Sequence, residues 1–227
     1  MVFITLAAFF VTNAVVAELI GGKLIQLGPF TMSIGIIPWP IVFLATDIIN
    51  EYYGKAGVRK LSIMTSCLIG YAFVLLYLGI MVKAASFSPV TDEQFSAVFG
   101  QSMWIIVASI TAFIFSQMID VFIFWLLRDK TGGKHIWLRS TGSTVISQLV
   151  DTFIVLGIGF WLPGKISTEN YINSALTGYT FKLMIAIVLT PMIYVLHAAI
   201  DKYLGKDEAH NIIKQSAEES LHHQVAD

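Results

Sequence analysis

Two segments place a hydroxyl, an amide and a carboxylate at the same spacing inside otherwise apolar stretches. The segments are 116–123 (SQMIDVFI) and 147–154 (SQLVDTFI), and both fit the pattern S-Q-x-x-D-x-F-I. The amide and the hydroxyl stand three and four residues before the aspartate, so a helix presents all three on one face. An ionised aspartate near the middle of a membrane helix costs about 3 kcal/mol. Two such segments predict a polar site that binds or moves a polar molecule within a membrane.

A third segment, 43–51 (FLATDIINE), adds Asp47 with Asn50 on the same helical face. Asp47 stands six residues before the end of an expected span, Asp120 seven before the end of another, and Asp151 eight past the start of a third. With alternating span directions, all three carboxylates lie about 9–12 Å inside one membrane boundary. The candidate substrate-binding residues of this layer are Asp47, Asn50, Gln117, Asp120, Gln148 and Asp151.

The chemistry of this layer points to a flat heterocycle. A carboxylate accepts two N–H groups at once, while an amide both donates and accepts. Together they match the edge of guanine or a pterin, where neighbouring N–H groups stand beside a carbonyl. The alternative is structural, since Gln and Ser in membrane helices often only bond a neighbouring helix, for less than about 1 kcal/mol. That alternative is weaker for the aspartates, because a carboxylate is a costly way to join helices.

Three further residues are candidates for other roles. Lys182 lies inside the last apolar span and needs a carboxylate or water as partner. Glu18, in the first span, matches its depth. The two are therefore a candidate gate or coupling pair, with a structural ion pair as the alternative. Trp39 stands between Pro38 and Pro40 and is a candidate for stacking on a flat ligand, although tryptophan is also typical of membrane boundaries.

Composition assigns the chain to the membrane proteins. Of the 227 residues 56% are hydrophobic and only 13% charged, about half the charged share of soluble domains. Apolar runs of about twenty residues predict transmembrane helices, and the N-terminal run is read as a retained helix rather than a signal peptide. The expected spans are 2–20, 34–53, 61–82, 103–127, 143–162 and 175–200. The sequence thus predicts an all-α integral membrane protein, with a transport domain over 1–205, a polar cytoplasmic tail over 206–227, and a hairpin or an extended lid over 21–33.

The distribution of basic residues orients these spans. Ten of the fourteen Lys and Arg fall in the connections 54–60 and 128–142 or after residue 200, against three in the opposite connections. Because basic residues concentrate in cytoplasmic loops, we expect six spans with both termini in the cytoplasm.

Enzyme and cofactor motifs are missing from the sequence. It has no phosphate-binding loop, dinucleotide fingerprint, H-E-x-x-H or G-x-S-x-G, so we expect no enzyme, cofactor, metal or nucleic-acid partner. An integral-membrane enzyme using Asp47, Asp120 and Asp151 as metal ligands or acid–base groups is a weaker alternative, and a purely structural or assembly role is weaker still. Membrane lipid is the expected surrounding, and a homo-oligomer remains open.

The run 43–51, the paired S-Q-x-x-D segments and the lead-in 139–144 (RSTGST) together resemble the queuosine precursor transporter family, also called the VUT family. The resemblance covers about residues 2–205. It implies a six-helix importer in the bacterial inner membrane for 7-cyano-7-deazaguanine or 7-aminomethyl-7-deazaguanine, which are intermediates for modified tRNA. The six acidic and amide residues of the polar layer lie at matching positions.

One alternative has a different mode of energy supply. Substrate-capture subunits of energy-coupling vitamin transporters are also six-helix proteins of this size, and they require an ATPase module. The repeated S-Q-x-x-D segments favour a stand-alone carrier, because secondary transporters are often built from internal repeats.

Overall fold

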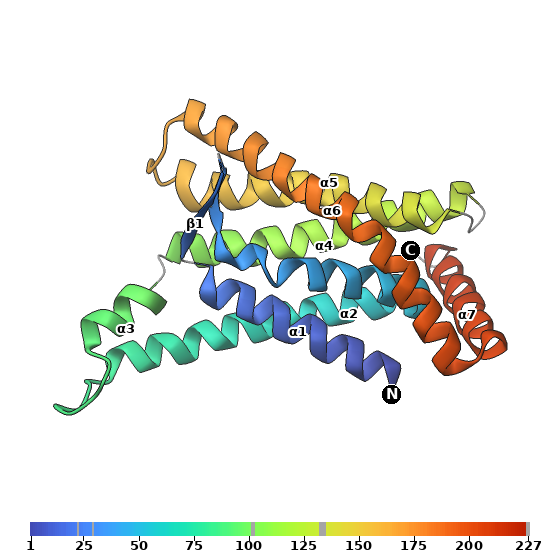
Figure 1. Ribbon diagram of the computed structural model, residues 1–227, viewed down its shortest axis with the longest axis horizontal. Coiled ribbons are helices and arrows are strands. Elements are labelled where there is room, and N and C mark those ends of the chain that lie inside the picture. The colour runs from blue at the N-terminus through green and yellow to red at the C-terminus, as the bar shows by residue number, and fades with distance from the viewer. Residues whose placement is uncertain (22, 29, 101–102, 132–134, 226–227) are drawn as a thin grey trace.

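The computed structural model describes residues 1–21, 23–28, 30–100, 103–131 and 135–225 (Figure 1). Seven α-helices and one β-hairpin make up most of this part. In chain order the elements are α1 (Val2–Ile20), β1 (Leu24–Leu27), β2 (Phe30–Ser33), the short 3-10 helix η1 (Ile34–Ile36), α2 (Trp39–Met81), α3 (Asp92–Phe99), α4 (Met103–Thr131), α5 (Ile136–Leu156), the π-helix η2 (Gly157–Trp161), α6 (Thr168–Leu204) and α7 (Lys206–Val225).

Five helical segments in the described part of the chain are long and apolar enough to cross a membrane. They are Val2–Ile20, Ile34–Met81, Asp92–Thr131, Ile136–Trp161 and Thr168–Leu204. The expected class, a helical multi-pass membrane protein, is therefore confirmed. The count of six spans stays a prediction, because residues 34–53 and 61–82 belong to one continuous segment.

That segment contains a break in the middle of α2. Its 48 residues would reach about 72 Å as a straight helix, more than twice the hydrocarbon core of a bilayer. Gly54 has φ 68° and ψ −177°, a conformation outside the helical region. Figure 1 shows that the chain reverses direction there, so the arm before Gly54 and the arm after it run antiparallel.

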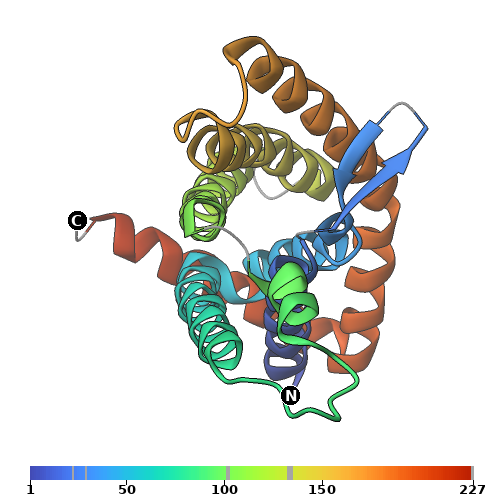
Figure 2. The ribbon, with the colours of Figure 1, turned by 90° about the vertical axis from the view of Figure 1, so that its left-hand side faces the viewer.

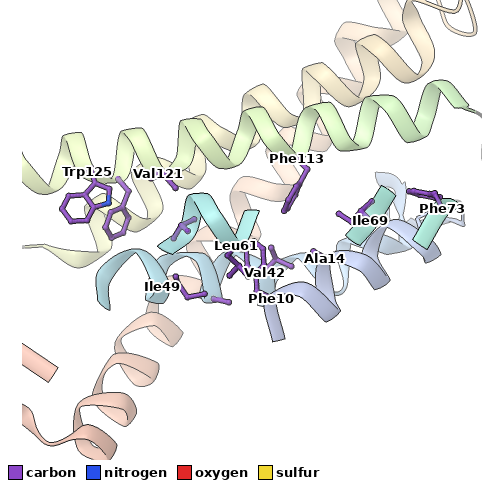
Figure 3. Close-up of a cluster of buried hydrophobic side chains, with 13 residues drawn as sticks. Phe10, Ala14, Val42, Ile49, Leu61, Ile69, Phe73, Phe113, Val121 and Trp125 are labelled. Atoms are coloured by element: carbon purple, nitrogen blue, oxygen red, sulfur yellow. The ribbon is translucent and has the colours of Figure 1, made fainter. Parts of the chain in front are cut away.

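The hydrophobic core lies between α1, both arms of α2 and α4. Phe10 and Ala14 of α1 meet Val42 and Leu61 of α2, while Phe113 comes from α4 (Figure 3). All five side chains are buried. Since the residues come from distant parts of the chain, this cluster holds the two arms of α2 against their neighbours and fixes how α2 is rotated.

The two ends of the bundle differ. The hairpin and α3 lie at one end, and α7 lies at the other end, where α1 begins (Figure 1). Viewed from the α3 end, most helices are seen nearly end-on and the hairpin projects beside them (Figure 2). The expected hairpin in 21–33 is confirmed by the antiparallel pairing of β1 with β2, apart from Gly22 and Pro29, which lie outside the described residues.

The C-terminal segment is helical and packs on the bundle. Ala209 of α7 is buried with Ile48 and Tyr52 of α2, and the Ser216 hydroxyl donates to the Glu51 carbonyl over 3.3 Å. The division at residue 205 remains a prediction. The structure adds that the segment interpreted as a polar tail covers the end of the bundle where α2 reverses.

Candidate functional site

Helix α5 presents a continuous polar face to the interior of the bundle. The residues of this face recur at intervals of three and four, which is the spacing of one helical surface. They are all buried, and they are Ser140, Ser143, Thr144, Ser147, Gln148, Asp151 and Thr152. The part of this face from Ser140 to Ser147 contacts carboxylates of α2 and α4. Asp151, further along the same face, contacts α6.

Two of the predicted carboxylates are held by serines of that face. The Ser140 hydroxyl donates to Oδ2 of Asp47 on α2. The Ser147 hydroxyl donates to Oδ1 of Asp120 on α4 over 3.0 Å, and the Ser143 hydroxyl donates to the Ser140 carbonyl over 3.0 Å. Asp47 and Asp120 lie within electrostatic range of each other. The structure therefore brings these two aspartates together through α5, as the depth argument from the sequence predicts.

A buried ion pair ties α2 to α5 one helical turn away. Nη2 of Arg139 lies 2.6 Å from Oε2 of Glu51, and the two side chains are only 3% and 5% exposed. The guanidinium also lies over the Phe124 ring, 5.6 Å from its centroid. Because Asp47 and Glu51 are one turn apart and Arg139 precedes Ser140, the two contacts form successive links between the same helices.

The third predicted carboxylate has a different partner. Nζ of Lys182 on α6 lies 2.6 Å from Oδ2 of Asp151, so Asp151 is part of an ion pair. The sequence did not predict this pair, and the pairing of Lys182 with Glu18 stays a prediction. Glu18 hydrogen-bonds Ser109 of α4 and lies within electrostatic range of both Asp151 and Lys182. A gating or coupling role for Glu18 and Lys182 remains a prediction.

Several polar atoms of the predicted set are buried without a hydrogen-bond partner among the described residues. They are Oδ1 of Asp47, Oδ1 and Nδ2 of Asn50, and Oε1 of Gln117. Asn50 is fully buried, and Gln117 is 5% exposed. Leaving such a group unpaired costs about 1–3 kcal/mol, so native proteins rarely tolerate it. Gln148 is also buried, on the polar face of α5. The unpaired atoms of Asp47, Asn50 and Gln117 are therefore candidates for contacts with a ligand.

A narrow cavity opens beside Asp47, between α2, α5 and α6. Its volume is about 10 Å³, close to what one water molecule requires, so a bicyclic ring enters only if the helices separate. The cavity is lined by Phe43, Leu44, Asp47, Ser140, Thr141, Thr144, Ala186, Leu189 and Ile193. The site is therefore closed in this conformation.

Trp39 lies next to this cavity rather than in its wall. Its ring stacks on Phe43 with 5.7 Å between centroids, and it approaches Phe113 at 5.9 Å. The aromatic ring that lines the cavity is Phe43. Stacking of Trp39 on a ligand remains a prediction.

Sequence reasoning missed Phe43, the Arg139–Glu51 pair and Ser140, and it singled out Ser147 without predicting its bond to Asp120. The sequence does contain a pattern that predicts the role of these serines. Hydroxyl residues recur at intervals of three and four from Ser140 to Asp151, the period of a helix face turned toward a polar neighbour. The ion pair has no such signal, because its partners are 88 residues apart.

Comparisons with known proteins agree with this architecture. Residues 33–196 match the family model described as "Putative vitamin uptake transporter". A protein of Bacillus subtilis (strain 168) named "Probable queuosine precursor transporter" is 30% identical over 188 residues, which is 82% of this chain and 79% of that protein. The "Queuosine precursor transporter" of Escherichia coli (strain K12) is 29% identical over 82% of each chain.

A third relative comes from Haemophilus influenzae and is named "Probable queuosine precursor transporter". It is 26% identical over 70% of this chain and 66% of its own length. No solved structure matches the chain. The relatives are named as transporters, which agrees with the apolar helices and the buried polar layer and with the expectation that the chain is not an enzyme. The family model covers well over half of the chain, and the chain belongs to the queuosine precursor transporter family, whose model is described as vitamin uptake transporters.

Proposed function

We propose that the protein imports a queuosine precursor, 7-cyano-7-deazaguanine or 7-aminomethyl-7-deazaguanine, across the bacterial inner membrane. The three relatives are named for transport of a queuosine precursor. The proposal includes six spans, with the two arms of α2 counted separately, and both termini in the cytoplasm. The reversal at Gly54 supports this count, and so does the position of α7 at the end of the bundle where α1 begins.

The observation that carries the proposal is the group of unpaired polar atoms at Asp47, Asn50 and Gln117. A deazaguanine presents N1–H and a 2-amino group as neighbouring donors and O6 as an acceptor. Carboxylate and amide oxygens accept from the donors, and an amide N–H donates to O6. The buried layer therefore offers the complement of this edge. Asp120, Gln148 and Asp151 complete the proposed layer.

A stand-alone carrier is favoured over a capture subunit. The repeated S-Q-x-x-D segments at 116–120 and 147–151 support this choice, because secondary transporters are often built from internal repeats. Under the alternative an ATPase module supplies the energy, and this chain alone supports no uptake.

The test is uptake in bacteria that cannot synthesise 7-cyano-7-deazaguanine and lack their own importer. Cells expressing only this chain receive the labelled nitrile or the aminomethyl compound, and queuosine in tRNA is measured. We expect at least one compound to restore the modification. Failure of both, with the protein confirmed in the membrane, would contradict the proposal of a stand-alone carrier.

A matched set of variants tests the role of the polar layer. Asp120→Asn and Asp151→Asn should reduce uptake more than Ser116→Ala, because the Ser116 hydroxyl donates to the Phe113 carbonyl of its own helix, at 3.3 Å. Equal, full uptake by all three variants would show that the layer is structural.

A further inference from the structure

The three membrane aspartates differ in how their oxygens are used. Asp151 is paired with the Lys182 ammonium. Asp120 accepts from Ser147 through Oδ1. Asp47 accepts from Ser140 through Oδ2, while its Oδ1 is buried with no hydrogen-bond partner in the described residues. Of the three carboxylates, Asp47 is the one with a buried oxygen that has no partner among the described residues.

Asp47 is also the aspartate that lines the cavity between α2, α5 and α6. Phe43 lines the same cavity four residues earlier on α2, so its ring and the carboxylate lie on one helical face. The Phe43 ring is supported from behind by Trp39 at 5.7 Å. A flat ring that stacks on Phe43 therefore directs one edge toward Asp47.

We propose that Asp47 is the carboxylate that recognises the paired N–H donors of the substrate, with Phe43 as the stacking surface and Ser140 as the group that orients Asp47. The inference rests on the proposed function and deepens it. It assigns substrate contact to Asp47, and it gives Asp120 and Asp151 the task of holding α4 and α6 against α5. The ligand class is a planar heterocycle with two adjacent N–H donors on one edge.

The geometry of a carboxylate fits this task. Its two oxygens accept two parallel N–H bonds, and each oxygen has a second lone pair. Oδ2 of Asp47 can keep the bond from Ser140 while it accepts a second donor, and Oδ1 accepts the other. A ligand with a single donor on this edge uses only one of the two oxygens.

Entry of the ring requires the cavity to widen, and α6 contains the place to bend. Ala186, Leu189 and Ile193 form the α6 wall, and Pro191 lies within it. Proline lacks the N–H that would bond the carbonyl four residues earlier, so the helix bends most easily there. Bending at Pro191 moves the apolar wall away while Asp47 and Ser140 stay on α2 and α5.

The experiment compares two ligands that differ in one donor. Binding of 7-cyano-7-deazaguanine and of 7-cyano-7-deazahypoxanthine, which lacks the 2-amino group, is measured on the purified full-length protein in detergent. The wild type should prefer the first by about 10-fold or more, the factor that corresponds to one charge-assisted hydrogen bond. Asp47→Asn should reduce this preference to roughly 2-fold, whereas Asp120→Asn and Asp151→Asn should keep it even where their affinity falls.

Two further variants distinguish a loss of recognition from a folding defect. Asp47→Glu keeps a carboxylate and should bind both ligands more weakly while retaining the preference. Phe43→Leu should weaken both ligands equally. The assignment is overturned if Asp47→Asn keeps the wild-type preference, or if Asp120→Asn or Asp151→Asn loses it. A wild-type protein that binds neither these two compounds nor 7-aminomethyl-7-deazaguanine would overturn the proposed function as well, so the two failures are distinguishable.

Discussion

The Lys182 ammonium of α6 and the Asp151 carboxylate of α5 form an ion pair of 2.6 Å inside helices that can cross a membrane. The two side chains are 23% and 12% exposed, so the pair is largely shielded from its surroundings. Glu18 of α1 and Ser109 of α4 lie beside it. Four helices therefore meet at a pair whose charges neutralise each other, which makes the pair a joint between α6 and the rest of the bundle.

Removing the lysine alone should destabilise this joint. Lys182→Met leaves the Asp151 carboxylate without its cation, and breaking a buried pair costs about 3–5 kcal/mol. The partial exposure of Lys182 places the expected loss at the lower end of this range. Thermal unfolding of the purified protein in detergent measures it.

The double variant Lys182→Met with Asp151→Asn is the control. It removes both charges, so it should be more stable than Lys182→Met alone. Unfolding of both variants at the wild-type temperature would show that the pair does not hold α6 in place.

Residue types and periodicity predicted the membrane class, the apolar segments and the hairpin, because these depend on local patterns. They also placed Asp47 and Asp120 at one depth. Depth is read along a single helix, however, and it does not tell how each helix is rotated toward its neighbours. Glu18 matched Lys182 by depth, yet the packing of α5 against α6 brings Asp151 to the lysine. For the same reason Arg139 and Glu51 were not recognised as partners.

The position of the C-terminal segment could not be predicted from the sequence either. Residues 206–225 are polar enough to stay in water, and only Ala209 and its neighbours pack on Ile48 and Tyr52. An apolar contact of this size leaves little trace in the composition of a short helix. The structure alone shows that α7 covers the end of α2.

The buried pair between α5 and α2 should be essential for stability. Arg139→Met leaves Glu51 buried at 4% exposure without its cation, and we expect a loss of about 3–5 kcal/mol. The exposed Arg59→Met serves as control and should change stability by less than about 0.5 kcal/mol. Thermal unfolding in detergent compares the two. Equal stability of the two variants would contradict a structural role for the pair.

Docking of α7 can be tested at two neighbouring positions. Ala209 is 1% exposed, so Ala209→Glu buries a charge without a partner and should release α7 from α2. His210 is exposed, and His210→Glu should leave α7 in place. Limited proteolysis of the purified protein should cut α7 faster in the first variant only. Equal rates of cleavage in both variants would indicate that α7 is not held by this contact.

Pro191 should affect the rate of transport more than the binding of substrate. Pro191→Ala supplies the missing backbone N–H and stiffens α6 beside the cavity. The residue is exposed, so the change leaves no internal hole. We expect slower uptake in cells and unchanged affinity in detergent. A variant that loses affinity without any change in the uptake rate would rule out bending of α6 at this residue.

Two glycines of α2 should respond in opposite ways to the same substitution. Gly54 has φ 68° and ψ −177°, a region that is essentially restricted to glycine, so Gly54→Ala should cost on the order of 1–3 kcal/mol. A Cβ at Gly70 would meet nothing within 4 Å, and Gly70→Ala should add roughly 0.5–1 kcal/mol of helix stability. Thermal unfolding of the two variants in detergent measures whether each substitution lowers or raises the stability.

The expected difference follows from the path of the chain. If Gly54 keeps α2 reversed, alanine there favours a straight helix, which separates Leu61 and Ile69 from the core they share with Val42. The arm that carries Asp47 then loses its neighbour, and uptake should fall together with stability. A Gly54→Ala protein as stable and as active as Gly70→Ala would show that the reversal does not depend on glycine.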